Sequence, residues 1–266
     1  MRFWRVMSVH AKPPNRLVVL VAQIALTAAF LGAWQWGANT GHIDTFFFAS
    51  PLQIGASIAK WWSHNYVIND VAVTMEETLL GLVIGGFAGI ALGVILASNR
   101  WLGAIFEPLL VVLNAMPRVT LVPLFILWFG FTIWSKVMGA IVLVLFVVFF
   151  ATYAGIKDVD PALVASARVL GAKPVDVVRH VLVPSALTWI FASLRSAVGF
   201  ALIGAVVAEY LGANAGVGYR IQASESQLDT SGVFGGLAIL MGLVFLVDTG
   251  IRAIQRRFIN WKPAAL

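Results

Sequence analysis

The stretch DPALVASARVLGAKPVDVVRHVLVP, residues 160–184, is the longest polar interruption in the second half of a very apolar chain. The pair Asp160-Pro161 is typical of a helix start, because aspartate caps a helix N-terminus and proline suits the first helical position. Gly171 follows several turns of helix-forming residues and is placed as the glycine that ends a helix. Pro174 can open a second short helix, which Pro184 would end. The stretch therefore predicts a helix, a glycine break and a second helix.

The composition around this stretch points to a membrane. Of the 266 residues, 60% are hydrophobic and 11% are charged, and the mean hydropathy is +0.91. Soluble globular domains carry roughly a quarter charged residues, so one water-soluble core cannot hide this much apolar surface. The chain has no cysteine, which excludes disulfides and thiolate metal sites. Its four histidines are scattered, so no metal site is expected.

Six apolar segments are long enough to be considered as membrane spans. A cleaved signal peptide is the alternative for the first, but its apolar run is longer than such peptides have. Residues 51–64 have amphipathic spacing and are expected along the membrane surface. The expected fold class is an all-α membrane protein with about six transmembrane helices, formed by residues 17–258 between an N-terminal segment (1–16) and a tail (259–266). The spans cover roughly residues 17–38, 78–98, 102–129, 137–153, 186–207 and 233–248.

Glycines recur at every fourth position in the second of these spans, at residues 81, 85, 89 and 93. Small residues at this spacing let the backbones of two membrane helices approach closely. We therefore expect these glycines to serve helix packing rather than ligand contact.

The lysines and arginines are distributed unevenly around the spans. If both termini are cytoplasmic, thirteen of the eighteen lie in cytoplasmic segments. The outer segments then hold only Lys60, Lys136 and Arg220, while Arg118 and Arg195 fall inside spans. Cytoplasmic loops of membrane proteins carry such an excess of basic residues, so we expect both termini and residues 160–184 in the cytoplasm. The net charge of +6 is thus a sign of topology and not of nucleic-acid binding.

Residues 160–184 resemble the EAA loop of permease subunits in ATP-binding-cassette (ABC) importers. Gly171 is followed thirteen positions later by Pro184, with Val181 and Val183 before it. The family's Glu-Ala-Ala triplet reads Ala165-Ser166-Ala167 here, so its glutamate is missing. Further segments resemble the branch that serves nitrate, sulfonate and taurine uptake. They are Met116-Pro117-Arg118, PLFILWFG (123–130), TYAG (152–155), Ala208-Glu209 and GVGY (216–219). The resemblance covers most of the chain after about residue 50.

The resemblance implies a type I ABC importer permease of the bacterial inner membrane, which is a transport subunit and not an enzyme. The chain lacks a G-x-x-x-x-G-K-[ST] phosphate loop, so it is expected to bind no cofactor, with ATP and Mg²⁺ held by separate ATPase subunits. A periplasmic solute-binding protein and a second permease copy, giving a homodimer, are the other implied partners. The expected solute is nitrate, a sulfonate or taurine. A pyrimidine-type vitamin precursor is the alternative, and an ion-coupled secondary transporter is the rival that needs no ATPase.

By this resemblance, the loop 157–184 holds a coupling helix that docks on the ATPase and passes its motion to the spans. Val164, Val169 and Leu170 are the candidates for an apolar docking face, while Arg168, Lys173 and Arg179 offer charges to the partner. An ordinary cytoplasmic connection is the alternative. The candidate coupling residues are Val164, Ala165, Ser166, Ala167, Arg168, Leu170, Gly171, Arg179 and Pro184.

Three ionisable residues are candidates for a translocation pathway. A charged group inside a span costs about 2.5–3.5 kcal/mol on insertion scales and usually faces a bundle interior or a water-filled cavity. Arg118 and Arg195 are therefore candidates for an anion-attracting lining. The alternative is a structural pair with Glu107, with Glu209 or with backbone carbonyls, which Pro117 would expose to Arg118. Glu209 is a candidate for an outer gate or for a surface that docks the binding protein, against the alternative of a solvated carboxylate at a helix end.

Overall fold

The computed structural model describes residues 16–258, with side chains for residues 17–99 and 101–250. The described part is entirely helical, and five of its helical stretches are long and apolar enough to cross a membrane, or up to six if the bent α4–α5 pair counts as one span. This confirms the predicted fold class. The elements in order are α1 (Arg16–Asn39), α2 (Pro51–Ser63), α3 (Tyr66–Ser98), α4 (Arg100–Ala115), the 3₁₀ turn η1 (Arg118–Leu121), α5 (Val122–Phe129), α6 (Ile133–Lys157), α7 (Pro161–Val169), α8 (Pro174–Val177), the π turn η2 (Val178–Leu182), α9 (Val183–Gly212), α10 (Val217–Ser226) and α11 (Thr230–Phe258).

Helices α3, α6 and α9 form the core of the bundle. A Cβ atom at Gly85 of α3 would lie 2.9 Å from the carbonyl oxygen of Ile141, and one at Gly89 would lie 2.7 Å from that of Leu145. The glycines thus let the backbones of α3 and α6 touch, which confirms the predicted packing role. Buried apolar side chains fill the space between α6 and α9: Ala140, Val144, Val148, Ala197 and Ala201.

Helix α3 starts at Tyr66, twelve residues earlier than the predicted second span. The polar residues of its first turns had suggested a connection outside the span. In the structure, Asp70, Thr74 and Glu77 are buried along one face of the helix. Their spacing of three and four residues places them on one face of a helix. These polar groups can be buried there because polar groups of other elements contact them.

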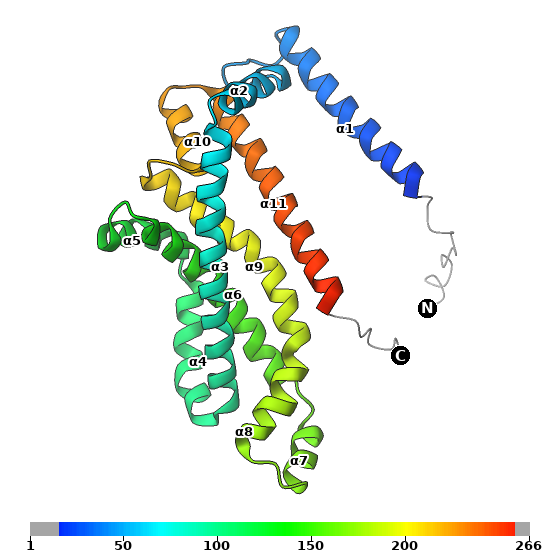
Figure 1. Cartoon of the computed structure of the whole chain (residues 1–266), viewed down its shortest axis with the longest axis vertical. Coiled ribbons are helices and arrows are strands. Elements are labelled where there is room, and N and C mark those ends of the chain that lie inside the picture. The colour runs from blue at the N-terminus through cyan, green and yellow to red at the C-terminus, as the bar shows by residue number, and fades with distance from the viewer. Residues whose placement is uncertain (1–15, 259–266) are drawn as a thin grey trace, which may run out of the picture.

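The predicted third span is two helices. Helices α4 and α5 are bent by 87° at a short break, and in Figure 1 α5 points away from the axis of α4. Met116 at the break has extended backbone angles (φ −66°, ψ 140°), as expected for the residue before a proline. Pro117 therefore explains the break, and Arg118 begins the 3₁₀ turn that follows it.

The molecule is elongated, and its two ends differ in character (Figure 1). Helices α7 and α8 lie at one end, and α2 and α10 lie at the other. Helix α2 is the predicted amphipathic helix, and it begins with a capping box between Ser50 and Gln53. Helix α1 runs apart from the core, and none of the most apolar window of its span is buried. The predicted terminal segments lie outside the described residues, apart from Arg16 at the start of α1.

Candidate functional sites

The first candidate site is α7 with the turn that follows it. The Asp160 carboxylate accepts a hydrogen bond from the backbone N–H of Ala162 at 2.8 Å, and Pro161 follows as the first helical residue. The helix ends in a Schellman motif: the N–H of Gly171 donates to the carbonyl of Arg168 at 3.0 Å, and that of Ala172 donates to Ala167 at 3.1 Å. Gly171 has a φ of +87°. The predicted helix and its glycine end are confirmed.

The prediction that Pro184 ends the second helix is wrong. Helix α8 continues through the π turn into α9, and Pro184 lies in the first turn of α9. The N–H of Val183 donates to the carbonyl of Val178, five residues back. This wider hydrogen-bond register accommodates a proline, which has no N–H to donate. Residues 174–212 therefore form one helical rod of 39 residues, about 58 Å long, that leads from α7 into the core.

Helix α7 exposes an apolar surface. It contains no buried residue, and Val169 and Leu170 are each 87% exposed. Of the predicted docking face, only Val164 is half-buried. Arg168 and Arg179 are exposed beside it. A short, well-capped helix with bare leucine and valine side chains is suited to docking in a groove of another protein.

The second candidate site lies at the opposite end, around Glu209. Only 1% of Glu209 is exposed, so the alternative of a solvated helix-end carboxylate is wrong. Its Oε1 accepts a hydrogen bond from the Thr74 hydroxyl at 2.6 Å, and its Oε2 accepts one from the N–H of Gly218 at 2.7 Å. One carboxylate thus joins α3, α9 and the start of α10.

Two residues of α3 complete this arrangement. Asp70 accepts hydrogen bonds from the N–H of Gly216 at 3.1 Å and from the Arg220 guanidinium at 2.7 and 2.8 Å. Thr74 Oγ1 accepts one from the N–H of Val217 at 2.9 Å. Three consecutive N–H groups at the α10 N-terminus are therefore held by side chains, and acidic partners suit a helix N-terminus. We call Asp70, Thr74, Glu209 and Arg220, with backbone 216–218, the α10 anchor.

Sequence reasoning missed most of the α10 anchor. The sequence pattern places Asp70 and Thr74 in a connection before the second span, and Arg220 in an outer segment. The sequence does contain a sign of the α10 anchor, because Asp70 and Thr74 are polar residues four positions apart and so lie on one face of a helix. Lys136 was also assigned to an outer segment, but it is only 3% exposed, and its ammonium group donates to the carbonyls of Phe131 and Thr132 at 2.9 and 3.2 Å.

Arg118 lies at the break between α4 and α5. Its guanidinium donates to the backbone oxygen of Asn114 at 3.2 Å and to the Asn114 side chain. It also lies over the ring of Phe146, 4.9 Å from the centroid. The Asn114 carbonyl is a partner of the kind expected near Pro117. Glu107 has a different neighbour, since it accepts a hydrogen bond from the Tyr153 hydroxyl at 2.6 Å.

Arg195 of α9 pairs with Asp248 of α11 at 3.0 Å. The side chains are 45% and 26% exposed, so this ion pair faces the outside of the single chain. Neither Glu107 nor Glu209 was the right structural partner. Arg118, Arg195 and Glu209 have separate neighbours, and the structure does not gather them into one site. Among the described residues, no group of three or more His, Asp and Glu side chains is arranged to hold a metal ion.

Known proteins resemble this chain in sequence and structure. Residues 89–260 match the family described as "Binding-protein-dependent transport system inner membrane component". The chain is 28% identical over 255 residues to the putative aliphatic sulfonates transport permease protein SsuC of Bacillus subtilis (96% of this chain, 92% of that protein). It is 28% identical over 260 residues to the taurine transport system permease protein TauC of Escherichia coli (94% and 92%). It is 32% identical over 217 residues to the formylaminopyrimidine transport permease protein ThiX of Halalkalibacterium halodurans (82% and 86%).

Among solved structures, the fold resembles a chain of the MetNI methionine ABC transporter in inward-facing conformations. The TM-score is 0.62, with 19% sequence identity, 71% of this chain and 94% of that chain covered. The likeness supports the expected ABC importer permease fold. At this identity, it carries no information on the solute.

Proposed function

The chain belongs to the binding-protein-dependent inner membrane components of ABC importers, and we propose that within this family it imports a small anionic solute of the sulfonate or taurine class. As a member, it is a multi-pass protein of the inner membrane and a transport subunit rather than an enzyme. The solute proposal is supported by the SsuC and TauC relatives and by two arginines, Arg118 at the break between α4 and α5 and Arg195 in α9.

One observation carries the proposed mechanism: α7 presents bare apolar side chains at the end of a continuous helical rod that enters the core. An ATPase that binds α7 and closes around ATP would displace the α9 rod. Because α9 packs closely on α6, the displacement would reach the core. ATP and Mg²⁺ would be held by that ATPase, and a second copy of this chain would complete the path. Both termini would be cytoplasmic, and a periplasmic binding protein would deliver the solute to the end that carries α10.

A formylaminopyrimidine is the second candidate solute, because ThiX is 32% identical to this chain. The binding protein that delivers the solute provides the discriminating measurement. Titration of that protein with taurine, alkanesulfonates, nitrate and formylaminopyrimidine would identify the solute class directly.

Single cysteines can test the docking proposal, because the chain has none of its own. We expect Asn214→Cys to react with an impermeant thiol reagent in intact cells, and Ser166→Cys of α7 to react only in inverted vesicles. Adding the ATPase should then protect Ser166→Cys. The control is Ser98→Cys at the α3–α4 turn, which is exposed and should stay reactive with the ATPase present. Outside labelling of Ser166→Cys, or no protection by the ATPase, would contradict the proposal.

A charge exchange can test whether Arg195 lines the path. We expect Arg195→Ala to reduce uptake of the anion by about ten- to a hundredfold, since a hydrogen bond to a charged group contributes about 1.5–3 kcal/mol. Arg195→Lys should keep part of the activity. The double variant Arg195→Asp with Asp248→Arg should assemble normally, because the ion pair is rebuilt in reverse, but it should not restore uptake. If the double variant transports normally, the pair is structural and the pathway role is wrong.

A further inference from the structure

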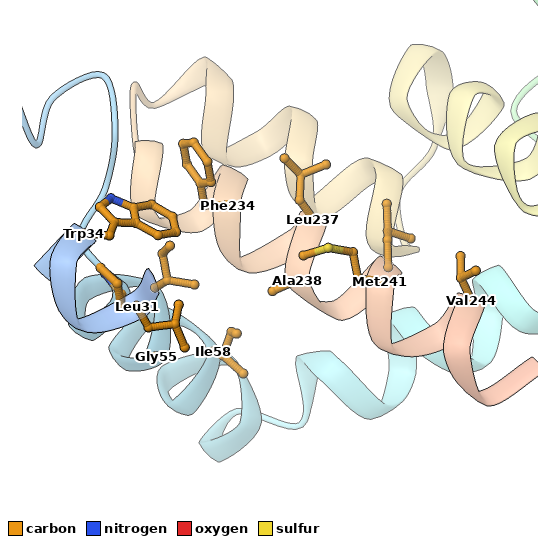
Figure 2. A pocket seen from close by; sticks show the side chains of 12 residues that line it. Leu31, Trp34, Gly55, Ile58, Phe234, Leu237, Ala238, Met241 and Val244 are labelled. Carbon is orange, nitrogen blue, oxygen red and sulfur yellow. The ribbon is translucent and has the colours of Figure 1, made fainter. Parts of the chain in front are cut away.

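The interior of the bundle, near the end that carries α10, contains ionisable side chains that the proposed mechanism does not use. This distinguishes it from the hollow between α1, α2 and α11, whose lining holds no charged side chain (Figure 2). Glu77 of α3, Lys136 of α6 and Glu209 of α9 are each 3% exposed or less. Charges in such surroundings need partners, because burial removes the water that would otherwise stabilise them.

Glu77 and Glu209 contact each other through their carboxyl groups, at hydrogen-bonding distance. An ionised carboxylate only accepts hydrogen bonds, so a hydrogen bond between two carboxyl groups requires a proton on one of them. Both oxygens of Glu209 already accept hydrogen bonds, from the Thr74 hydroxyl and from the N–H of Gly218. In contrast, no N–H or O–H group of the described residues donates to the buried Oε2 of Glu77. Glu209 is therefore suited to be the ionised member, and Glu77 the member that carries the proton.

The charges around the pair favour the same arrangement. In the described part of the chain, the cations of this cluster are Lys136 and Arg220. Arg220 is paired with Asp70 at 2.7 Å, so these two charges balance each other. Lys136 faces both buried glutamates and must balance them alone, while Glu76, next along α3, is exposed and adds further negative charge nearby. One ammonium group balances one buried carboxylate, and a second ionised carboxylate would be buried without compensation, which is strongly unfavourable.

We propose that Glu77 and Glu209 form a binding site for one proton, which joins α3 to α9 beside the α10 anchor. The bound proton forms the O–H group that Glu77 donates to Glu209, and Lys136 balances the single negative charge that remains. If α3 and α9 part at this level, both carboxyl groups meet water, where glutamates are ionised at neutral pH. The packed arrangement thus holds one proton more than the parted one. A rise in pH therefore weakens the packing of α3 on α9, and a fall in pH strengthens it.

The variant Glu77→Gln tests the proposal, because glutamine has the shape of a protonated glutamate and donates to Glu209 through an amide N–H that does not titrate. Glu76→Gln is the matched control, since it makes the same substitution at the neighbouring exposed position. At neutral pH, the infrared spectra of the purified wild type and of Glu76→Gln should contain the C=O band of a protonated carboxyl group. We expect Glu77→Gln to lose this band. Absence of the band from the wild type, or its persistence in Glu77→Gln, would overturn the proposal.

The melting temperature as a function of pH gives a second readout on the same three proteins. Between about pH 6 and pH 9, the melting temperature of the wild type and of Glu76→Gln should fall by about 3 °C per pH unit more than that of Glu77→Gln. The reason is that a proton bound only in the folded state changes the folding equilibrium by up to about tenfold per pH unit. Parallel pH profiles in all three proteins would contradict the proposal. Failure of Glu77→Gln to fold would contradict it too, because glutamine reproduces the hydrogen bond of a protonated glutamate.

Discussion

Replacing Gly171 with valine is expected to reduce solute uptake strongly while leaving a membrane-inserted protein. Gly171 has a φ of +87° in the Schellman motif that ends α7. A residue with a side chain pays about 1–2 kcal/mol in this region, and β-branched residues are the least tolerated. A Cβ atom there would meet nothing within 4 Å. The effect is therefore conformational: the turn must change, and α7 loses its fixed position relative to the α9 rod.

The expected loss of uptake is about tenfold or more, in line with a strain of that size. Uptake and ATP hydrolysis would be measured together in reconstituted vesicles. Gly171→Asn is the matched control, because asparagine is tolerated in the left-handed region, and it should keep most of the uptake. Insertion and permease pairing should survive in both variants, since residue 171 lies outside the candidate spans. Normal solute-stimulated hydrolysis with normal uptake in Gly171→Val would contradict the coupling role of α7.

The parts of this loop that could be predicted are those with local causes. An aspartate cap, a proline at the first helical position and a glycine at the helix end each act within one turn of the chain. The structural role of Pro184 could not be predicted in the same way. Its effect depends on the π turn before it, and that turn joins α8 to a helix which is held by packing against α6.

The pathway candidates show that contacts between distant parts of the chain could not be predicted from the sequence. The charge of Arg195 inside an apolar segment correctly predicts that its guanidinium group has a polar partner. Its partner Asp248 lies 53 residues away on α11, and no local pattern links the two. Glu209 is a similar case, because its partners come from α3 and from the backbone of residue 218. The bundle topology decides which polar groups meet, and a local sequence pattern does not contain that topology.

The second large effect is expected at the α10 anchor. Glu209→Ala should lower the free energy of unfolding by about 1–3 kcal/mol for each of the two buried hydrogen-bond donors that it leaves without an acceptor. The variant leaves the hydroxyl of Thr74 and the N–H of Gly218 without their acceptor, in a site where Glu209 itself is 1% exposed. Glu209→Gln should be less harmful, because one amide oxygen remains as an acceptor. The melting temperature in detergent gives the size of each effect.

Glu225→Ala is the matched control, since Glu225 lies on α10 itself but is exposed, with Tyr210 as its hydrogen-bond partner. An exposed pair of this kind contributes little, so the control should melt close to the wild type. Hydrogen exchange locates the effect: in Glu209→Ala, the amides of Gly216, Val217 and Gly218 should exchange faster, while those of the α3–α6 contact stay protected. Because Asp70 still holds the N–H of Gly216, exchange there should rise least. Unchanged melting with all three amides still protected would show that Glu209 does not hold α10 in place.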